Sequence, residues 1–149
     1  MSGTARALRL AVALVALAAI AVALFRLEGE TEGLEIARDR VDGTPVTVFR
    51  KAGAPPAPAV VIAHGFAGSR QLMRSFSLTL ARAGYVAVAF DFRGHGRNPK
   101  PLTGDVTEED GATRVLVAEL DRMTAWARDL PGSDGRVMLL GHSMASDIV

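Results

Sequence analysis

The segment of this sequence best able to do chemistry runs from Gly141 to Ala145 and carries Ser143 at its centre. The apolar run 137–140 before it predicts a buried strand that leads into a tight turn and then a helix. Small residues two places before and two places after the serine let the strand and helix cross closely, which raises the hydroxyl above the sheet edge. The pattern predicts a nucleophile elbow, with Ala145 at the place of the usual second glycine.

Two other polar loops follow apolar runs of strand length. Residues 59–63 end in the loop 64–68, of sequence His-Gly-Phe-Ala-Gly, and residues 85–90 lead into the glycine-rich loop 91–99. The carboxyl ends of parallel strands meet at one edge of a sheet, and ligands bind there. We therefore expect these two loops and Ser143 to converge on a single site.

Two amphipathic helices are expected between these strands. Ser69 can cap the first helix, Gly84 can end it, and its apolar stripe follows the helical spacing. This stripe consists of Leu72, Phe76 and Leu80. The second helix is predicted to start at a capping box, Thr107-x-x-Asp110, and to stop before Pro131-Gly132. Its stripe consists of Leu116, Leu120, Met123 and Ala127.

The alternation of strands and helices predicts an α/β fold. Strands at 59–63, 85–90 and 136–140, joined by helices, form a parallel sheet with helices on its faces. Before them, residues 34–41 and 45–50 flank Asp42-Gly43 and predict an antiparallel hairpin of edge strands. The expected fold is a mostly parallel sheet with an N-terminal antiparallel hairpin, preceded by an apolar helix.

Residues 1–27 differ from the rest and are predicted to be a transmembrane anchor or a signal peptide. An uninterrupted apolar run of 16 residues, 10–25, follows Arg6 and Arg9. Two more apolar residues before Arg9 extend it to about 19 residues, or about 28 Å of helix, which spans a bilayer core. We favour a single-pass anchor. A cleaved signal peptide and a buried soluble helix are the alternatives.

The arginines that flank the apolar run do not by their number decide on which side of the membrane the N-terminus lies. Arg6 and Arg9 precede the apolar run, but Arg26, Arg38 and Arg40 follow it closely. Since Arg38 and Arg40 fall in a predicted strand, we expect an inside N-terminus and an exported domain. Cleavage near residues 21–23, Ala-Val-Ala, would instead release a secreted protein.

The amino-acid composition limits which partners and which nucleophiles the chain can use. The 149 residues carry a formal net charge of +1 with both signs interspersed, so the sequence predicts neither a nucleic-acid partner nor any other electrostatic one. Without cysteine, a nucleophile must be oxygen or nitrogen. Three histidines at these spacings form no metal ligand set, and no cofactor is expected. Trp126 is expected to serve packing.

Together, the loops at 64–69, 91–96 and 141–145 resemble the N-terminal half of α/β-hydrolases, above all esterases, lysophospholipases and dienelactone-hydrolase-like proteins. The resemblance covers about residues 34–149. It implies that Ser143 is the nucleophile, attacking an ester, thioester or amide carbonyl of a small-molecule substrate to give an acyl-enzyme. It also implies that the amide N–H groups of Phe66 and Met144 form the oxyanion hole.

The sequence departs from this family after the nucleophile. The acid and base of the triad normally follow the serine, but only six residues follow Ser143 and none is histidine. Asp147 is a poor acid, being four residues further on the same helix. We therefore interpret residues 28–149 as the N-terminal part of a longer hydrolase, inactive as a fragment and left with an unpaired strand edge. A non-catalytic binding or membrane-anchored domain is the alternative.

Other polar residues of the loops are expected to be structural. His64 is predicted to stabilise its loop by hydrogen bonds to backbone, and His95 to shape the next loop. His142 is expected to tune the elbow or the pocket. Asp91 and Arg93 are predicted to form an ion pair with each other or to hold their loop.

Overall fold

The structure, a computed structural model, describes residues 3–105 and 111–149. The chain divides into two compact units, Met1–Glu32 and Gly33–Val149. The predicted capping box of the second helix, residues 107–110, lies outside the described residues.

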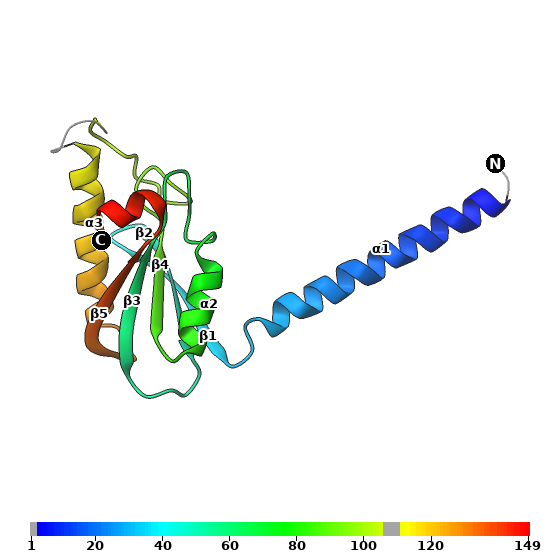
Figure 1. The fold of residues 1–149 in the computed structure, drawn as a ribbon, viewed down its shortest axis with the longest axis horizontal. Helices are drawn as coiled ribbons and strands as arrows, with labels where there is room; N and C mark the ends of the chain where they lie inside the picture. Colours follow the sequence, from blue (N-terminus) through cyan, green and yellow to red (C-terminus); the bar gives the residue numbers. More distant parts are fainter. Residues whose placement is uncertain (1–2, 106–110) are drawn as a thin grey trace. The chain divides into compact units, whose positions relative to one another are not determined.

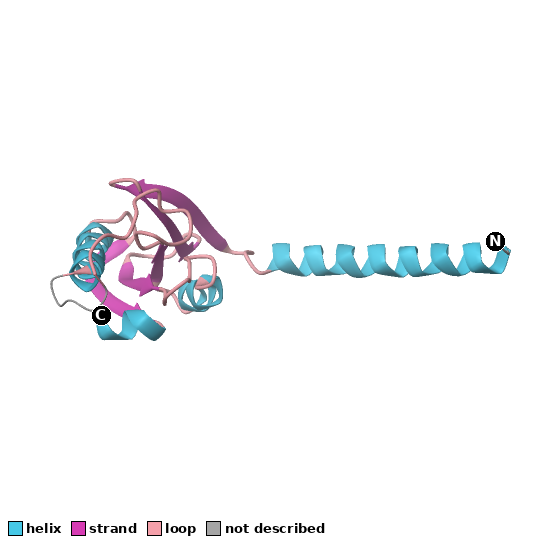
Figure 2. Ribbon diagram, turned by 90° about the horizontal axis from the view of Figure 1, so that it is seen from above, coloured by secondary structure: helices cyan, strands magenta, loops and turns pink. Residues whose placement is uncertain are grey.

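The first unit is essentially one helix, α1 (Gly3–Gly29), which Figure 2 shows as unbroken. Its segment Gly3–Leu27 has a mean hydropathy of 2.6 over its most apolar window, and none of that window is buried. By length and composition this helix can cross a membrane, and a signal sequence would share both properties.

The second unit is built on a five-stranded mixed sheet. Its strands are β1 (Leu34–Val41), β2 (Thr44–Lys51), β3 (Ala57–Ala63), β4 (Val86–Phe90) and β5 (Ser133–Gly141), in the order β1-β2-β4-β3-β5. β3 is parallel to both β4 and β5, whereas β2 is antiparallel to β1 and to β4. The predicted α/β fold class is confirmed.

The hairpin of β1 and β2 turns at Asp42 and Gly43, which both have positive φ, 48° and 84°. Positive φ at both central residues matches the twist of the flanking strands and explains the glycine. The prediction that both strands are edge strands is wrong for β2. Because Val46 pairs with Phe90 of β4, β2 lies inside the sheet and only β1 forms an edge.

Two helices cover opposite faces of the sheet: α2 (Arg74–Arg82) and α3 (Ala112–Arg128) (Figure 1). Residues alternate between these faces along the central strand. Val61 packs in the cluster with Leu120 and Met123 of α3, whereas Val60 and Ile62 pack in the cluster that contains α2. The strands β3 and β4 are therefore buried on both faces, as their continuous apolar runs predicted. The prediction of a buried strand is wrong for β5, where Met138 and Leu139 are 43% and 41% exposed.

The apolar stripe predicted for the first helix is wrong in phase. α2 begins at Arg74 rather than after Ser69, because a turn bonded from Leu72 N–H to Ser69 O comes first. This start turns Ser77, Leu78 and Ala81 toward the sheet. Leu72 and Phe76 stay 65% and 45% exposed. Gly84, at φ 95°, does end this helix as expected.

The stripe predicted for α3 is confirmed, since Leu116, Leu120, Met123 and Ala127 are all buried. Two further buried residues of this helix, Ala112 and Glu119, were not predicted. Glu119 is fully buried beside Leu120, on the same face of the helix.

Candidate active site

Ser143 lies at the turn where β5 ends and the short 3₁₀ helix η1 (Ser143–Asp147) begins. It is exposed, and its backbone has the left-handed φ of 55°. A Cβ at Gly141 would collide with the carbonyl oxygen of Ala145, which is itself fully buried. The predicted need for small neighbours is therefore explained by a close crossing of strand and helix. The helix predicted after the turn is present as the 3₁₀ helix η1.

The loop after β3 lies directly against this turn. A Cβ at Gly65 would be 2.8 Å from Ser143 Cβ and 3.0 Å from the carbonyl oxygen of His142. His142 N–H donates to Ala63 O at 3.0 Å, which ties the two strand ends together. Only glycine at position 65 allows this approach, and the loop and the serine consequently share one side of the sheet edge.

The two backbone amides expected to face the serine are free. Among residues 3–105 and 111–149, neither Phe66 N–H nor Met144 N–H donates a hydrogen bond. Phe66 follows Gly65 directly and precedes Ala67, whose φ of 53° bends the loop. An unpaired amide next to an exposed hydroxyl can bind a developing negative charge.

An apolar groove of about 340 Å³ opens beside Ser143. Its walls come from the loop after β3, the start of α2 and the elbow. Leu72 and Phe76, exposed contrary to the predicted stripe, are among its lining residues. Their exposure thus has a local explanation, because they line the groove rather than the core. The other lining residues are Gly65, Phe66, Gly68, Met73, His142 and Ser143.

His64 is buried and both of its ring nitrogens are engaged. Nδ1 lies 2.8 Å from Gly65 O and Nε2 lies 3.1 Å from Phe92 N, so Nδ1 carries the proton and Nε2 accepts. Burial lowers the pKa of His64 below its usual 6.5, and it is neutral at pH 7. This neutral ring stabilises the loop, as predicted.

His95 shapes the loop after β4, again as predicted. Its Nδ1 lies 2.8 Å from Arg93 O, and its ring packs 5.3 Å from that of His64 and 5.8 Å from that of Phe66. His142 is exposed beside Ser143 and lines the groove. Within the described residues, no histidine ring hydrogen-bonds Ser143 Oγ. Asp147 is exposed on η1.

Asp91 holds two loops at once. Its buried carboxylate forms an ion pair with Arg70, accepts Arg70 N–H at 2.7 Å and accepts Arg97 N–H at 2.9 Å. The prediction that Asp91 holds its loop is confirmed, but the predicted partner, Arg93, is wrong. Arg70 reaches it from the neighbouring loop because β3 and β4 are adjacent, which no sequence spacing reveals.

Glu119 is the buried carboxylate that sequence reasoning missed. It accepts Arg93 N–H at 2.8 Å, Thr44 Oγ1–H at 2.7 Å and Asn98 Nδ2–H at 3.1 Å. It thereby joins α3, the loop after β4 and the start of β2. Its place three residues after Leu116, within the apolar stripe, was the available signal.

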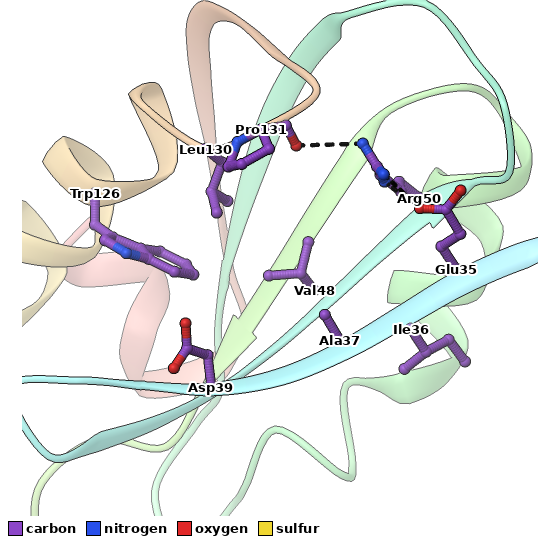
Figure 3. A pocket seen from close by; sticks show the side chains of 9 residues that line it. All are labelled: Glu35, Ile36, Ala37, Asp39, Val48, Arg50, Trp126, Leu130 and Pro131. Atoms are coloured by element: carbon purple, nitrogen blue, oxygen red, sulfur yellow. Dashed lines mark hydrogen bonds and ion pairs between the residues drawn. The ribbon is translucent and has the colours of Figure 1, made fainter.

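A second hollow, of about 540 Å³, lies between the hairpin and the C-terminal end of α3 (Figure 3). Ala37, Val48 and Trp126 line it, and Arg50 Nε donates to Glu35 at 2.7 Å near its mouth. It shares no lining residue with the groove at Ser143 and takes no part in that site.

Comparison with known proteins agrees with this arrangement. A sequence profile described as the alpha/beta hydrolase fold matches residues 58–149. Epoxide hydrolase A of Mycobacterium tuberculosis is 32% identical over 99 residues, 66% of this chain and 28% of that protein. An epoxide hydrolase of Caballeronia sordidicola is 34% identical over 77 residues, 52% of this chain and 23% of that protein. The chain thus spans about a quarter of the length of these relatives.

Among solved structures, epoxide hydrolase VrEH1 from Vigna radiata aligns with a TM-score of 0.54 and 25% identity. That alignment covers 78% of this chain and 33% of the other. A putative dienelactone hydrolase from Klebsiella pneumoniae aligns with a TM-score of 0.58 at 21% identity, over 75% of this chain and 51% of the other, and shows the fold alone.

Proposed function

The chain belongs to the α/β-hydrolase family, and from that premise we propose that Ser143 is the nucleophile of a hydrolase that cleaves an ester or related acyl bond. The observation that carries the proposal is the left-handed, exposed Ser143 packed against Gly65. A strained backbone at an exposed nucleophile is the conformation that presents its hydroxyl to a substrate.

In the proposed reaction, Ser143 Oγ attacks the substrate carbonyl, the bond to the leaving group breaks, and the leaving group departs with the proton that the hydroxyl loses. Water then hydrolyses the acyl-serine, which releases the acid and restores the hydroxyl. The free amides of Phe66 and Met144 would donate to the developing oxyanion. One such donor typically lowers the barrier by about 3 kcal/mol. No histidine of the described part of the chain hydrogen-bonds Ser143 Oγ as a general base would.

The lining of the groove supports an apolar acyl group. Phe66, Leu72 and Phe76 offer exposed apolar surface beside Ser143, and burying such surface contributes about 25 cal/mol per Å². We expect esters with short to medium alkyl chains to react faster than charged or strongly polar ones.

A fluorophosphonate probe tests the nucleophile in the protein expressed from its complete gene. We expect labelling that disappears in Ser143→Ala and survives in Ser146→Ala, the matched control one helical turn further on. Labelling that persists in Ser143→Ala, or no labelling of the wild type, would refute the serine mechanism.

The names of the relatives favour a second candidate, an epoxide hydrolase. Chemistry argues against Ser143 as its nucleophile: a serine oxygen that opens an epoxide forms an alkyl ether, which water does not cleave under mild conditions. An epoxide reaction here would need direct attack by water.

Turnover of an epoxide that continues in Ser143→Ala would support this candidate, whereas ester turnover lost in Ser143→Ala supports the first. A wild type that turns over neither esters nor epoxides would favour a non-catalytic binding domain.

We further propose that the segment Gly3–Leu27 anchors the chain in a membrane, with the folded unit on the exported side. Its length, its apolarity and its unburied surface support this. Extraction of membranes with carbonate at high pH should leave the full-length protein in the pellet. Release of the protein at full length would contradict anchoring, and release at a lower mass would indicate signal cleavage.

A further inference from the structure

A second polar site lies on the α2 face of the sheet. A pocket of about 550 Å³ is lined by four arginines that come from separate parts of the sequence. Arg38 lies on β1, Arg70 in the loop after β3, Arg74 at the start of α2 and Arg97 in the loop after β4. Although opposite charges are interspersed along the sequence, the fold gathers these four cations in one place.

Three of the four arginines lack an acidic partner. Asp91 is occupied by Arg70 and by the amide of Arg97. Among the described residues, the guanidinium groups of Arg38, Arg74 and Arg97 form no salt bridge. The pocket consequently carries an excess of positive charge, which repels itself unless an anion binds.

Asp39, the acidic residue next to Arg38 on β1, does not line this pocket. Successive side chains of a strand point to opposite faces, and Arg38 pairs with Thr47, which also lines this pocket. Asp39 lies with Ala37 in the hollow on the α3 face (Figure 3). It also borders a shallower extension of the arginine pocket, where it accepts the N–H of Arg40 at 2.7 Å.

Two of the arginines are held in place before any ligand binds. Arg70 is fixed by Asp91 and by a 3.1 Å hydrogen bond from its Nε to Thr47 Oγ1. The guanidinium of Arg74 lies 5.9 Å above the ring of Phe49. Ordering long side chains in advance lowers the entropic cost of binding.

We propose that this pocket binds a phosphate group, either of a soluble phosphate ester or of a lipid headgroup. Guanidinium groups bind phosphate oxygens through paired N–H donors, and three unpaired cations suit a dianion better than a single carboxylate. The amide of Gln71 adds a neutral donor at the wall. The pocket volume falls in the range that admits a small ligand beyond the phosphate itself.

The test uses the full chain in non-ionic detergent, titrated calorimetrically with inorganic pyrophosphate at constant ionic strength. We expect saturable binding that weakens at least about tenfold for each arginine removed, in R38Q and R97Q singly and together. R128Q, an exposed arginine on α3, is the matched control and should bind as the wild type does. Equal weakening in R128Q, or a wild type that binds none of pyrophosphate, glycerol phosphate and dihexanoyl phosphatidate, would overturn the proposal.

Two further measurements distinguish a soluble phosphate ester from a lipid headgroup and test whether the variants still fold. Monomeric dihexanoyl phosphatidate that binds when pyrophosphate and glycerol phosphate do not would identify a lipid headgroup. Dihexanoyl phosphatidylcholine serves as the zwitterionic comparison. Thermal unfolding without ligand should occur at the same or a higher temperature in R38Q and R97Q, because like charges are removed. If the double variant fails to fold, ligand binding is compared between the wild type and the single variant R97Q, which changes only an exposed loop side chain. Unchanged binding in R97Q would then contradict the proposal.

Discussion

Two loops at the same edge of the sheet are built in opposite ways. The loop after β4 is held by the buried carboxylates of Asp91 and Glu119, which together accept hydrogen bonds from five residues. The elbow after β5 is exposed at Ser143, which has a φ of 55°, and no buried carboxylate of the described residues hydrogen-bonds it. We infer that the first loop supplies stability and the second supplies a reactive hydroxyl at some cost in stability.

The largest expected effect comes from removing Asp91. Asp91→Ala leaves the largely buried guanidinium of Arg70 without its partner, and breaking a buried pair in this way typically costs about 3–5 kcal/mol. The free energy of unfolding, measured by urea denaturation of the full chain in detergent, should fall by that amount. The exposed Asp39→Ala should change it by under about 0.5 kcal/mol. If Asp91→Ala and Asp39→Ala lower the free energy of unfolding by equally small amounts, Asp91 does not stabilise the loop after β4 in the way that this comparison requires.

Glu119→Ala should be the next most damaging change. It leaves three donors without their buried acceptor, among them Arg93 N–H, and each unsatisfied group costs about 1–3 kcal/mol unless water reaches it. We expect a net loss of about 2–3 kcal/mol in the same denaturation experiment. Glu119→Gln keeps one acceptor and the side-chain volume and should lose less. A Gln variant as unstable as the Ala variant would contradict this account.

At the elbow, a substitution should instead raise the free energy of unfolding. Ser143→Gly relieves the positive φ and should raise the free energy of unfolding by about 1 kcal/mol, while abolishing fluorophosphonate labelling. Ser143→Ala should abolish labelling without that gain, because alanine retains the Cβ. If Ser143→Gly is less stable than Ser143→Ala, the turn is not strained in the way the comparison requires.

The smallest effect concerns His64, which hydrogen-bonds Gly65 O in the loop after β3 and Phe92 N–H in the loop after β4. Its native pKa is lowered by burial, so the unfolded chain binds a proton at a pH where the native chain does not. Stability should therefore decline as the pH falls below 6.5 toward the native pKa, by under about 1 kcal/mol between pH 7 and pH 6. The variant His64→Gln should lose this share of the pH dependence. An unchanged pH profile in that variant would exclude His64 as the titrating group.

Much of the fold could be predicted because the signals are local. Apolar runs identified β3, β4 and β5, and the Asp42-Gly43 pair identified the hairpin. The stripe on α3 was predicted in the correct phase. The stripe on α2 was not, because apolar residues that line a groove look the same in sequence as residues that line a core.

The candidate site divides in the same way. Gly141, Ser143 and Ala145 could be found from their spacing, since a tight crossing demands small residues at fixed offsets. The partner of Asp91 could not, because Arg70 reaches it across neighbouring strands and lies 21 positions away in the chain. The buried role of Glu119 and the arginine pocket likewise depend on which strands are adjacent.

The sequence by itself determined the strands, the turn residues and the presence of an exposed serine after the last of these strands. These follow from periodicity and from the backbone angles that glycine and other small residues permit, both of which act over a few residues. Only the tertiary structure decided which charges meet, because strand order β1-β2-β4-β3-β5 brings together residues that no local rule relates. Coulomb energy and hydrogen bonding depend on distance in space, and that distance is set once the sheet has formed.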